Sequence, residues 1–200
     1  MQASSARALI LASTSHYRRA LLERLQLPFS VQAPGVDETP MAGEPPASLA
    51  SRLALAKATA VSVTAPHALV IGCDQVADLQ GQALGKPGNY QNALGQLRAM
   101  RGQTVVFQTA MAVVCKESGF CEEVLVPVRV AYREASDAEI DFYLRAEEPY
   151  DCAGSVKSEG LGIALMQSID NDDPTALIGL PLIRLSAILR QAGIAVLGQT

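Results

Sequence analysis

The chain has 200 residues, of which 49% are hydrophobic and 18% charged, so a core can form without disulfides or a structural metal. Its net charge of −4 argues against a nucleic-acid binder, whose affinity depends on many cationic contacts to phosphate. Its apolar runs are shorter than the roughly 18 residues of a membrane helix and do not form a signal peptide, which predicts a cytoplasmic protein without a membrane partner.

The predicted elements alternate between strands and helices. Apolar or β-branched runs indicate the strands, and apolar residues at helical spacing indicate the helices. Ser15 and Ser48 are suitable helix caps, and Ser136 can form a capping box with Glu139. In chain order we expect strand 8–13, helix 16–25, strand 29–33, helix 48–63, strand 68–73, helix 89–100, strands 103–115 and 120–133, helix 136–146, strand 162–169 and helix 181–191.

The connections between these elements indicate the fold class. Proline and glycine predict a loop over residues 34–46 and turns over residues 81–88, and residues 116–119 join two long strands as a hairpin. The hairpin interrupts an otherwise alternating order, so we expect an α/β fold with a mixed sheet. The chain contains no internal repeat or long linker, which predicts a single domain over residues 1–200.

The four cysteines do not indicate a zinc site, because none forms a C-x-x-C pair and the chain has only two histidines. Cys115 and Cys121 flank the predicted hairpin turn and can face each other. Reduced, half-buried thiols are the favoured interpretation for a chain without a secretory signal.

Two segments rich in serine and glycine, residues 9–19 and 150–162, suggest a site for a phosphorylated small molecule. Glycine lets the backbone approach an anion closely, and Lys157 adds a mobile cation. Arg18 lies in the first turn of a predicted helix. There it either binds an anion or covers the core with its alkyl stem.

Other charged residues have both a structural and a functional interpretation. Lys57, at the edge of an apolar stripe, either reaches solvent or points into a cleft, and Lys86 in a stiff turn is by itself an ordinary surface lysine. Glu38 by itself is a solvated loop charge, and residues 170–174 form an acidic loop or Asx turn. Asp74 is expected at the carboxyl end of a buried strand, where open α/β sheets bind ligands, as a base, a metal ligand or both.

Six segments in this order resemble the Maf family over about residues 8–190. They are residues 11–22, 36–39, 52–58, 72–75, 85–87 and 152–160. Maf proteins are nucleoside triphosphate pyrophosphatases, so the resemblance implies hydrolysis between the α and β phosphates with a divalent cation (Mg²⁺, Mn²⁺ or Co²⁺). It also implies an elongated protomer similar to inosine-triphosphate pyrophosphatase, with two lobes flanking a substrate cleft, and usually a homodimer.

The resemblance also implies a set of catalytic and binding residues. Catalysis must neutralise the charge that develops on the departing pyrophosphate. The residues carried over are Arg18, Lys57, Lys86 and Lys157 for phosphate charge, Ser13 for a phosphate hydrogen bond, Glu38 and Asp74 for the metal, and Asp74 for activating the attacking water.

Further details resemble the subfamily that prefers 7-methyl-GTP. Gln75 follows Asp74, where the dTTP- and UTP-preferring branch usually has threonine. A guanine methylated at N7 is positively charged and favours an aromatic face and a carboxylate, which Tyr17 and Glu159 can supply. Gln75 would pair with a base edge or order Glu159. His16 and Tyr17 depart from the proline and tryptophan common at these positions, which affects selectivity more than catalysis.

Three alternatives stay open. The first is a pyrimidine-preferring Maf pyrophosphatase, which Gln75 disfavours. The second is a nucleotide-binding regulator of cell division that does not turn over its ligand. The third is a structural α/β protein whose basic loops bind nothing. Release of pyrophosphate distinguishes the enzymes from the regulator.

Overall fold

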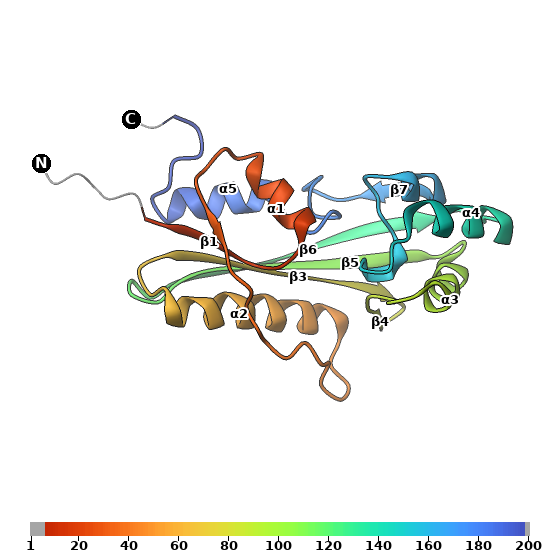
Figure 1. Cartoon of the computed structure of the whole chain (residues 1–200), viewed down its shortest axis with the longest axis horizontal. Coiled ribbons are helices and arrows are strands. Elements are labelled where there is room, and N and C mark those ends of the chain that lie inside the picture. The colour runs from red at the N-terminus through yellow and green to blue at the C-terminus, as the bar shows by residue number, and fades with distance from the viewer. Residues whose placement is uncertain (1–6, 199–200) are drawn as a thin grey trace, which may run out of the picture.

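A computed structural model describes residues 7–198 as a long sheet with helices on both faces (Figure 1). The elements are β1 (Leu9–Ala12), α1 (His16–Glu23), β2 (Ser30–Val31), α2 (Pro46–Thr64), β3 (Leu69–Leu79), β4 (Gln82–Leu84), α3 (Tyr90–Met100), β5 (Thr104–Cys115), β6 (Phe120–Tyr132), α4 (Asp137–Glu147), two 3₁₀ turns (Ala153–Ser155 and Leu161–Leu165), β7 (Met166–Asp170) and α5 (Leu182–Gln191). Within this part of the chain, none of the helices combines the length and hydropathy that crossing a bilayer requires.

The sheet is mixed, as predicted. Its strand order is β2-β1-β3-β5-β6-β7, with β4 paired to β3. β1 is parallel to β2 and β3, whereas the pairs β3–β4, β3–β5, β5–β6 and β6–β7 are antiparallel. The long strands β3, β5 and β6 run through the length of the molecule and connect its two ends (Figure 1).

The two faces of the sheet are covered by different helices. Alternate side chains of a strand point to opposite faces. Val70 and Val76 of β3 therefore pack toward α2, whereas Ile71 and Cys73 pack in a cluster with α1 and α5. A further cluster at the other end of the long strands joins α3, α4 and the 3₁₀ turns.

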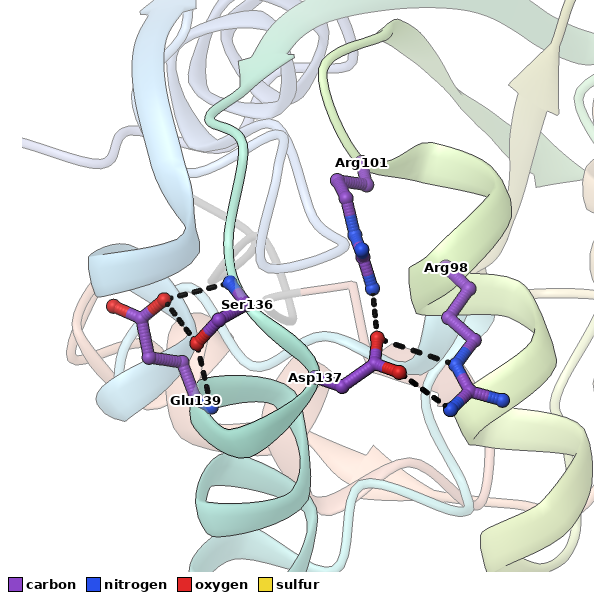
Figure 2. Close-up of polar contacts among 5 residues, drawn as sticks. All are labelled: Arg98, Arg101, Ser136, Asp137 and Glu139. Atoms are coloured by element: carbon purple, nitrogen blue, oxygen red, sulfur yellow. Dashed lines mark hydrogen bonds and ion pairs between the residues drawn. The ribbon is translucent and has the colours of Figure 1, made fainter.

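Helix α4 is fixed at its start by hydrogen bonds within the helix and by ion pairs to α3 (Figure 2). The Ser136 hydroxyl accepts from the Glu139 amide at 3.3 Å, and the Glu139 carboxylate accepts from the Ser136 amide at 2.7 Å, which confirms the capping box. Asp137 forms ion pairs with Arg98, at 2.7 Å, and with Arg101. These contacts hold α4 against α3 at the end of the molecule that carries residues 150–160.

One edge of β3 is interrupted. β1 pairs with β3 as far as Gly72 and β4 pairs with it from Ala77, whereas β5 pairs along the opposite edge from Val70 to Asp78. Residues 73–76 therefore have no strand partner on the β1 side, and we call this stretch the β3 gap. The carboxyl ends of both β1 and β4 face it, so the loops that follow these two strands begin there.

The prediction that β3 ends at residue 73 is wrong, because the strand continues to Leu79. Residues beyond Asp74 still pair with β5, and a charged side chain within a strand is tolerated when it has a partner on a neighbouring helix. Asp74 nevertheless lies just beyond the end of β1, at the carboxyl edge of the parallel part of the sheet.

Four other local predictions need correction. Helix α2 starts at Pro46, not at a Ser48 cap, because proline suits the first turn of a helix. Residues 82–84, expected to be a turn, form β4, and residues 162–165, expected in a strand, belong to the 3₁₀ turn Leu161–Leu165. Cys121 pairs with Val114 across the hairpin and not with Cys115, and all four cysteines are free. The expectation of free thiols is therefore confirmed, but only Cys152 is half-buried, since Cys73 and Cys115 are buried and Cys121 is exposed.

Helix α2 approaches β3 closely because Gly72 has no side chain. A Cβ atom at this position would lie under 3.0 Å from the Ala54 carbonyl oxygen and the Ala58 amide nitrogen, which are both backbone atoms of α2. Backbone cannot yield as a flexible side chain can, so Gly72 fixes the spacing between helix and sheet.

We expect Gly72→Ala to lower the free energy of unfolding by about 1–3 kcal/mol, because the added methyl group overpacks the interface. Gly95→Ala is the matched control, since Gly95 is an exposed residue of α3 with open space around its Cα. That change should raise stability by about 0.5–1 kcal/mol. Urea unfolding of both variants checks the pair. Equal stability of Gly72→Ala and the wild type would show that α2 can move away from β3 freely.

Candidate active site

The side chain of Lys57 lies between two carboxylates at the β3 gap. Its Nζ is 2.6 Å from Asp74 Oδ1 and 2.8 Å from Glu38 Oε1. Lys57 is 4% exposed and Asp74 is 7% exposed, so this ion pair is almost entirely removed from water. Buried charges persist only when they are paired, which makes Lys57 and Asp74 mutually dependent. We call the three residues the Glu38–Lys57–Asp74 triad.

The sheet and α2 determine the position of Lys57 and Asp74. Asp74 follows Gly72 by two residues and therefore points to the same face of β3, toward α2. Lys57 lies next to Ala58, whose backbone approaches Gly72. The sequence placed Lys57 at the edge of the apolar stripe, but the structure places it within the buried face of the helix.

Arg52 holds the loop that carries Glu38. Its Nε is 2.6 Å from Glu44 Oε1 and its Nη2 is 2.7 Å from Glu44 Oε2, and Nη2 also donates to the Thr39 carbonyl at 3.1 Å. The hydrogen bonds from Arg52 lower the pKa of Glu44 to about 2. Both contacts join the Pro- and Gly-rich loop to α2 and so bring Glu38 to Lys57.

Two further cations lie within electrostatic range of the triad. Burial alone would raise the pKa of Glu38. The hydrogen bond and charge of Lys57, together with the charges of Lys86 and Arg18, more than offset burial and lower it. Three of the four cations predicted to bind phosphate, Lys57, Lys86 and Arg18, therefore act electrostatically on Glu38, and Lys57 also contacts it.

Lys86 belongs to a turn that is fixed on both sides by α3. Gln96 donates to the Gly85 carbonyl at 3.1 Å, and Asn92 donates to the Pro87 carbonyl at 2.9 Å. The Lys86 side chain is itself exposed. The turn follows β4, whose carboxyl end faces the β3 gap, so a rigid backbone presents a mobile ammonium beside the triad.

Arg18 and Ser13 occupy the loop and helix that follow β1. Arg18 Nε donates to the Gly179 carbonyl at 3.0 Å, and the Cys73 thiol donates to the same oxygen at 2.9 Å. Ser13, which is 5% exposed, accepts the amide hydrogen of Ser15 at 3.1 Å. Ser15 in turn caps α1, as predicted. Arg18 is therefore half-buried and oriented by a carbonyl group from a distant segment.

Gln75 points to the opposite face of the sheet from Asp74. Its Nε2 lies 3.0 Å from the Ala176 carbonyl, 2.9 Å from the Leu177 carbonyl and 2.9 Å from the Thr109 hydroxyl. The Gln75 amide nitrogen thus contacts residues 176–177 and Thr109, whereas its predicted roles toward a base edge or Glu159 stay predictions. Gln75 joins β3 to the segment that contains Gly179.

Asp173 is fully buried, and the prediction of a solvated acidic loop is wrong for this residue. It accepts from the amides of Ile183 and Arg184, at 2.8 and 3.1 Å, and from the Thr175 hydroxyl at 2.9 Å. The Thr175 amide also donates to it, which confirms the Asx turn. Asp173 thereby caps α5 and anchors the turn that presents Gly179 to Arg18. The Arg184 amide lies 11 residues along the chain from Asp173, whereas a usual capping residue immediately precedes its helix.

Lys157 contacts α4 rather than the triad. Its Nζ donates to the Glu147 carbonyl at 2.6 Å, near the carboxyl end of α4, where cations stabilise unpaired carbonyl groups. The Tyr143 hydroxyl accepts from the Lys157 amide at 2.9 Å and donates to the Ser155 carbonyl at 3.2 Å. The segment of residues 150–162 is therefore packed against α4, and Lys157 binds the Glu147 carbonyl.

Tyr17 connects α1 to the same segment. The Cys152 thiol donates to the Tyr17 hydroxyl at 3.6 Å, so the two serine- and glycine-rich segments meet in space. Burial, followed by the contact with Cys152 and by smaller contributions that include Glu159, raises the pKa of Tyr17. The aromatic ring and the carboxylate proposed for base recognition thus lie on facing segments.

Two hollows of the surface lie elsewhere. One, of about 100 Å³, is lined by Ser51 and Glu123 among others, and the other, of about 320 Å³, is lined by Arg190 and residues 193–197. Neither lining includes a predicted site residue. The candidate site is therefore defined by the contacts and charges of its residues.

Comparison with known proteins identifies relatives along nearly the whole chain. Residues 8–192 match the Maf-like protein family. A protein from Polaromonas sp. is 65% identical over 96% of this chain and 87% of its own length, and one from Albidiferax ferrireducens is 64% identical over 96% of each. One from Aromatoleum aromaticum is 58% identical over 93% of this chain and 96% of its own length. All three are named 7-methyl-GTP pyrophosphatase.

We expect Asp173→Ala to lower the free energy of unfolding by roughly 2–3 kcal/mol, because it removes a buried carboxylate that accepts from the backbone amides of Thr175, Ile183 and Arg184. Asp172→Ala is the matched control, since the neighbouring Asp172 is exposed, and it should change stability by less than about 0.5 kcal/mol. Chemical denaturation of the two variants measures the difference. Similar values for both would show that Asp173 does not anchor α5.

Proposed function

The chain belongs to the Maf-like protein family, and we propose that it is a nucleoside triphosphate pyrophosphatase that hydrolyses 7-methyl-GTP to 7-methyl-GMP and pyrophosphate. The close approach of Glu38, Lys57 and Asp74 at the β3 gap carries this proposal, because it combines an acid, a cation and a possible metal ligand in one place. The shared name of relatives at 58–65% identity supports the same activity.

The positive side chains fit the charge of the substrate. A nucleoside triphosphate brings about four negative charges, and more negative charge develops on the pyrophosphate as it departs. We propose that Lys86, Arg18 and Lys57 neutralise this negative charge. They come from three segments around the β3 gap, and the charge of each lowers the pKa of Glu38. The Ser13 hydroxyl uses its oxygen to accept from Ser15 and keeps its hydrogen for a phosphate oxygen.

Asp74 is our choice for the base. Lys57 binds its Oδ1, and we assign Oδ2 to the attacking water. The water oxygen forms a bond to the α phosphorus while Asp74 accepts one of its protons, and the bond from that phosphorus to the bridging oxygen breaks. The electron pair of that bond leaves with pyrophosphate, and Asp74 returns its proton to solvent.

The residues present also fit a divalent cation. Glu38 and Asp74 direct carboxylate oxygens at one cationic atom, the Lys57 nitrogen, which stands in for a metal. Among residues 7–198, no group of three or more His, Cys, Asp or Glu side chains is placed to hold a metal ion, so the protein itself offers two carboxylate ligands here. Glu38 and Asp74 would hold Mg²⁺, Mn²⁺ or Co²⁺. When bound, the cation neutralises phosphate charge.

We assign Tyr17 and Glu159 to recognition of the nucleobase. The ring of Tyr17 offers an aromatic face to the positive 7-methylguanine, and the carboxylate of Glu159 offers a negative charge. We also assign Lys157 to phosphate, which requires it to exchange the Glu147 carbonyl for the substrate. From the family resemblance we further propose one two-lobed domain, a homodimer and a cytoplasmic location.

We expect Asp74→Asn to lower kcat for 7-methyl-GTP by roughly 10²–10⁴-fold, because the amide cannot accept the proton of the attacking water. Pyrophosphate release measures the rate, and Glu122→Gln, which changes an exposed carboxylate on β6, should behave like the wild type. Normal turnover by Asp74→Asn would require another base. A wild type that binds nucleotide and releases no pyrophosphate would favour the regulator.

We expect Tyr17→Leu to lower kcat/KM for 7-methyl-GTP about 3–30-fold and to affect GTP less, because the variant loses the cation–π contact. Tyr17→Phe keeps the ring and should retain the preference. Kinetics with 7-methyl-GTP, GTP, dTTP and UTP test this directly. Equal efficiency of the wild type on GTP and 7-methyl-GTP would remove the role of the methylated base, and higher efficiency on dTTP or UTP would indicate the pyrimidine branch.

A further inference from the structure

The Lys57 ammonium occupies the position from which one cation can contact both acids of the triad. Its Nζ is 2.6 Å from Asp74 and 2.8 Å from Glu38, and the Lys57 side chain is 5% exposed. One positive charge thus partly neutralises two negative ones, of which Asp74 is buried and Glu38 is half-exposed. The protein supplies its own cation at the place where a metal would bind.

A divalent cation cannot take both carboxylates while the ammonium remains. Metal–oxygen contacts of Mg²⁺ and Mn²⁺ are roughly 2.0–2.2 Å long, so a metal and Nζ would compete for the same oxygens and repel each other. Lys57 must therefore move when a metal binds to Glu38 and Asp74. Lys86 and Arg18, whose charges also act on Glu38, further oppose a free cation.

The displaced ammonium needs a new partner, because it starts from a buried position. A lysine has a flexible stem and can carry its charge over several ångströms. The phosphate oxygens of a bound nucleotide offer such a partner beside the gap, whereas a metal ion that arrives alone offers none. Removal of the ammonium without replacement would also leave Asp74 as an uncompensated buried charge.

We propose that Lys57 is a built-in competitor that excludes free divalent cations from Glu38 and Asp74 until a nucleotide arrives. Nucleotide binding draws the ammonium onto phosphate and opens the carboxylate pair to the metal. The nucleotide then raises the affinity for the metal, and by thermodynamic linkage the metal raises the affinity for the nucleotide by the same factor. This inference rests on the proposed function for the identity of the nucleotide, but not on turnover.

The test measures Mn²⁺ binding to the free protein by electron paramagnetic resonance of unbound Mn²⁺. Lys57→Met keeps the length of the side chain and removes its charge, so it should bind Mn²⁺ about tenfold or more tightly than the wild type. Lys116→Met, in the exposed hairpin turn, is the matched control and should bind like the wild type. No gain in Lys57→Met would overturn the proposal.

The coupling is measured by calorimetry with the α,β-methylene analogue of 7-methyl-GTP, which cannot be hydrolysed at the relevant bond. Mn²⁺ should tighten analogue binding to the wild type, and this tightening should be smaller in Lys57→Met. Equal tightening in both proteins would contradict the competition.

A further variant keeps the test decisive if Lys57→Met does not fold. Glu38 is half-exposed, so Glu38→Gln should fold, and it should lose the tightening of analogue binding by Mn²⁺. Retention of the full effect would overturn the proposal. Absence of pyrophosphate release by the wild type would instead contradict the proposed function, whatever the Mn²⁺ measurements give.

Discussion

The ion pair between Lys57 and Asp74 is the interaction on which the rest of the site depends. It joins α2 to β3 across a contact that Gly72 keeps short, and it allows a carboxylate to remain charged within a buried strand. The same ammonium brings in Glu38 from a loop that Arg52 holds against α2. Helix, sheet and loop are thus joined at one charged atom.

The mixed sheet explains why these groups meet where they do. Parallel pairing stops with β1 and antiparallel pairing with β4 begins five residues further along β3, which opens the β3 gap. The segments after β1, β2 and β4 supply the candidate phosphate and metal ligands. Along the opposite edge, β3 pairs with β5 in antiparallel fashion from Val70 to Asp78, so the sheet continues past the gap.

Local signals in the sequence predicted most elements, whereas long-range contacts did not follow from them. The Ser15 cap and the Ser136 capping box use hydrogen bonds within three residues, and both are confirmed. Gln75, by contrast, bonds to a carbonyl 102 residues away, and Asp173 caps a helix from outside it. Such partners depend on how the sheet brings distant segments together.

In the candidate site, too, long-range contacts did not follow from the sequence. Family resemblance named its residues, but it did not predict that Lys57 would bridge two acids or that Lys157 would contact α4. Gly72 carries a local signal of the close contact with α2, since an isolated glycine within a strand often marks a close backbone approach.

A crystal structure with Mg²⁺ and the α,β-methylene analogue of 7-methyl-GTP tests the central claim most directly. The account predicts that the triphosphate lies at the β3 gap, with Lys57, Lys86 and Arg18 within hydrogen-bond distance of phosphate oxygens and Asp74 next to the α phosphate. A nucleotide bound elsewhere, for example in the hollow lined by Arg190 and residues 193–197, with the Glu38–Lys57–Asp74 triad unchanged, would contradict it.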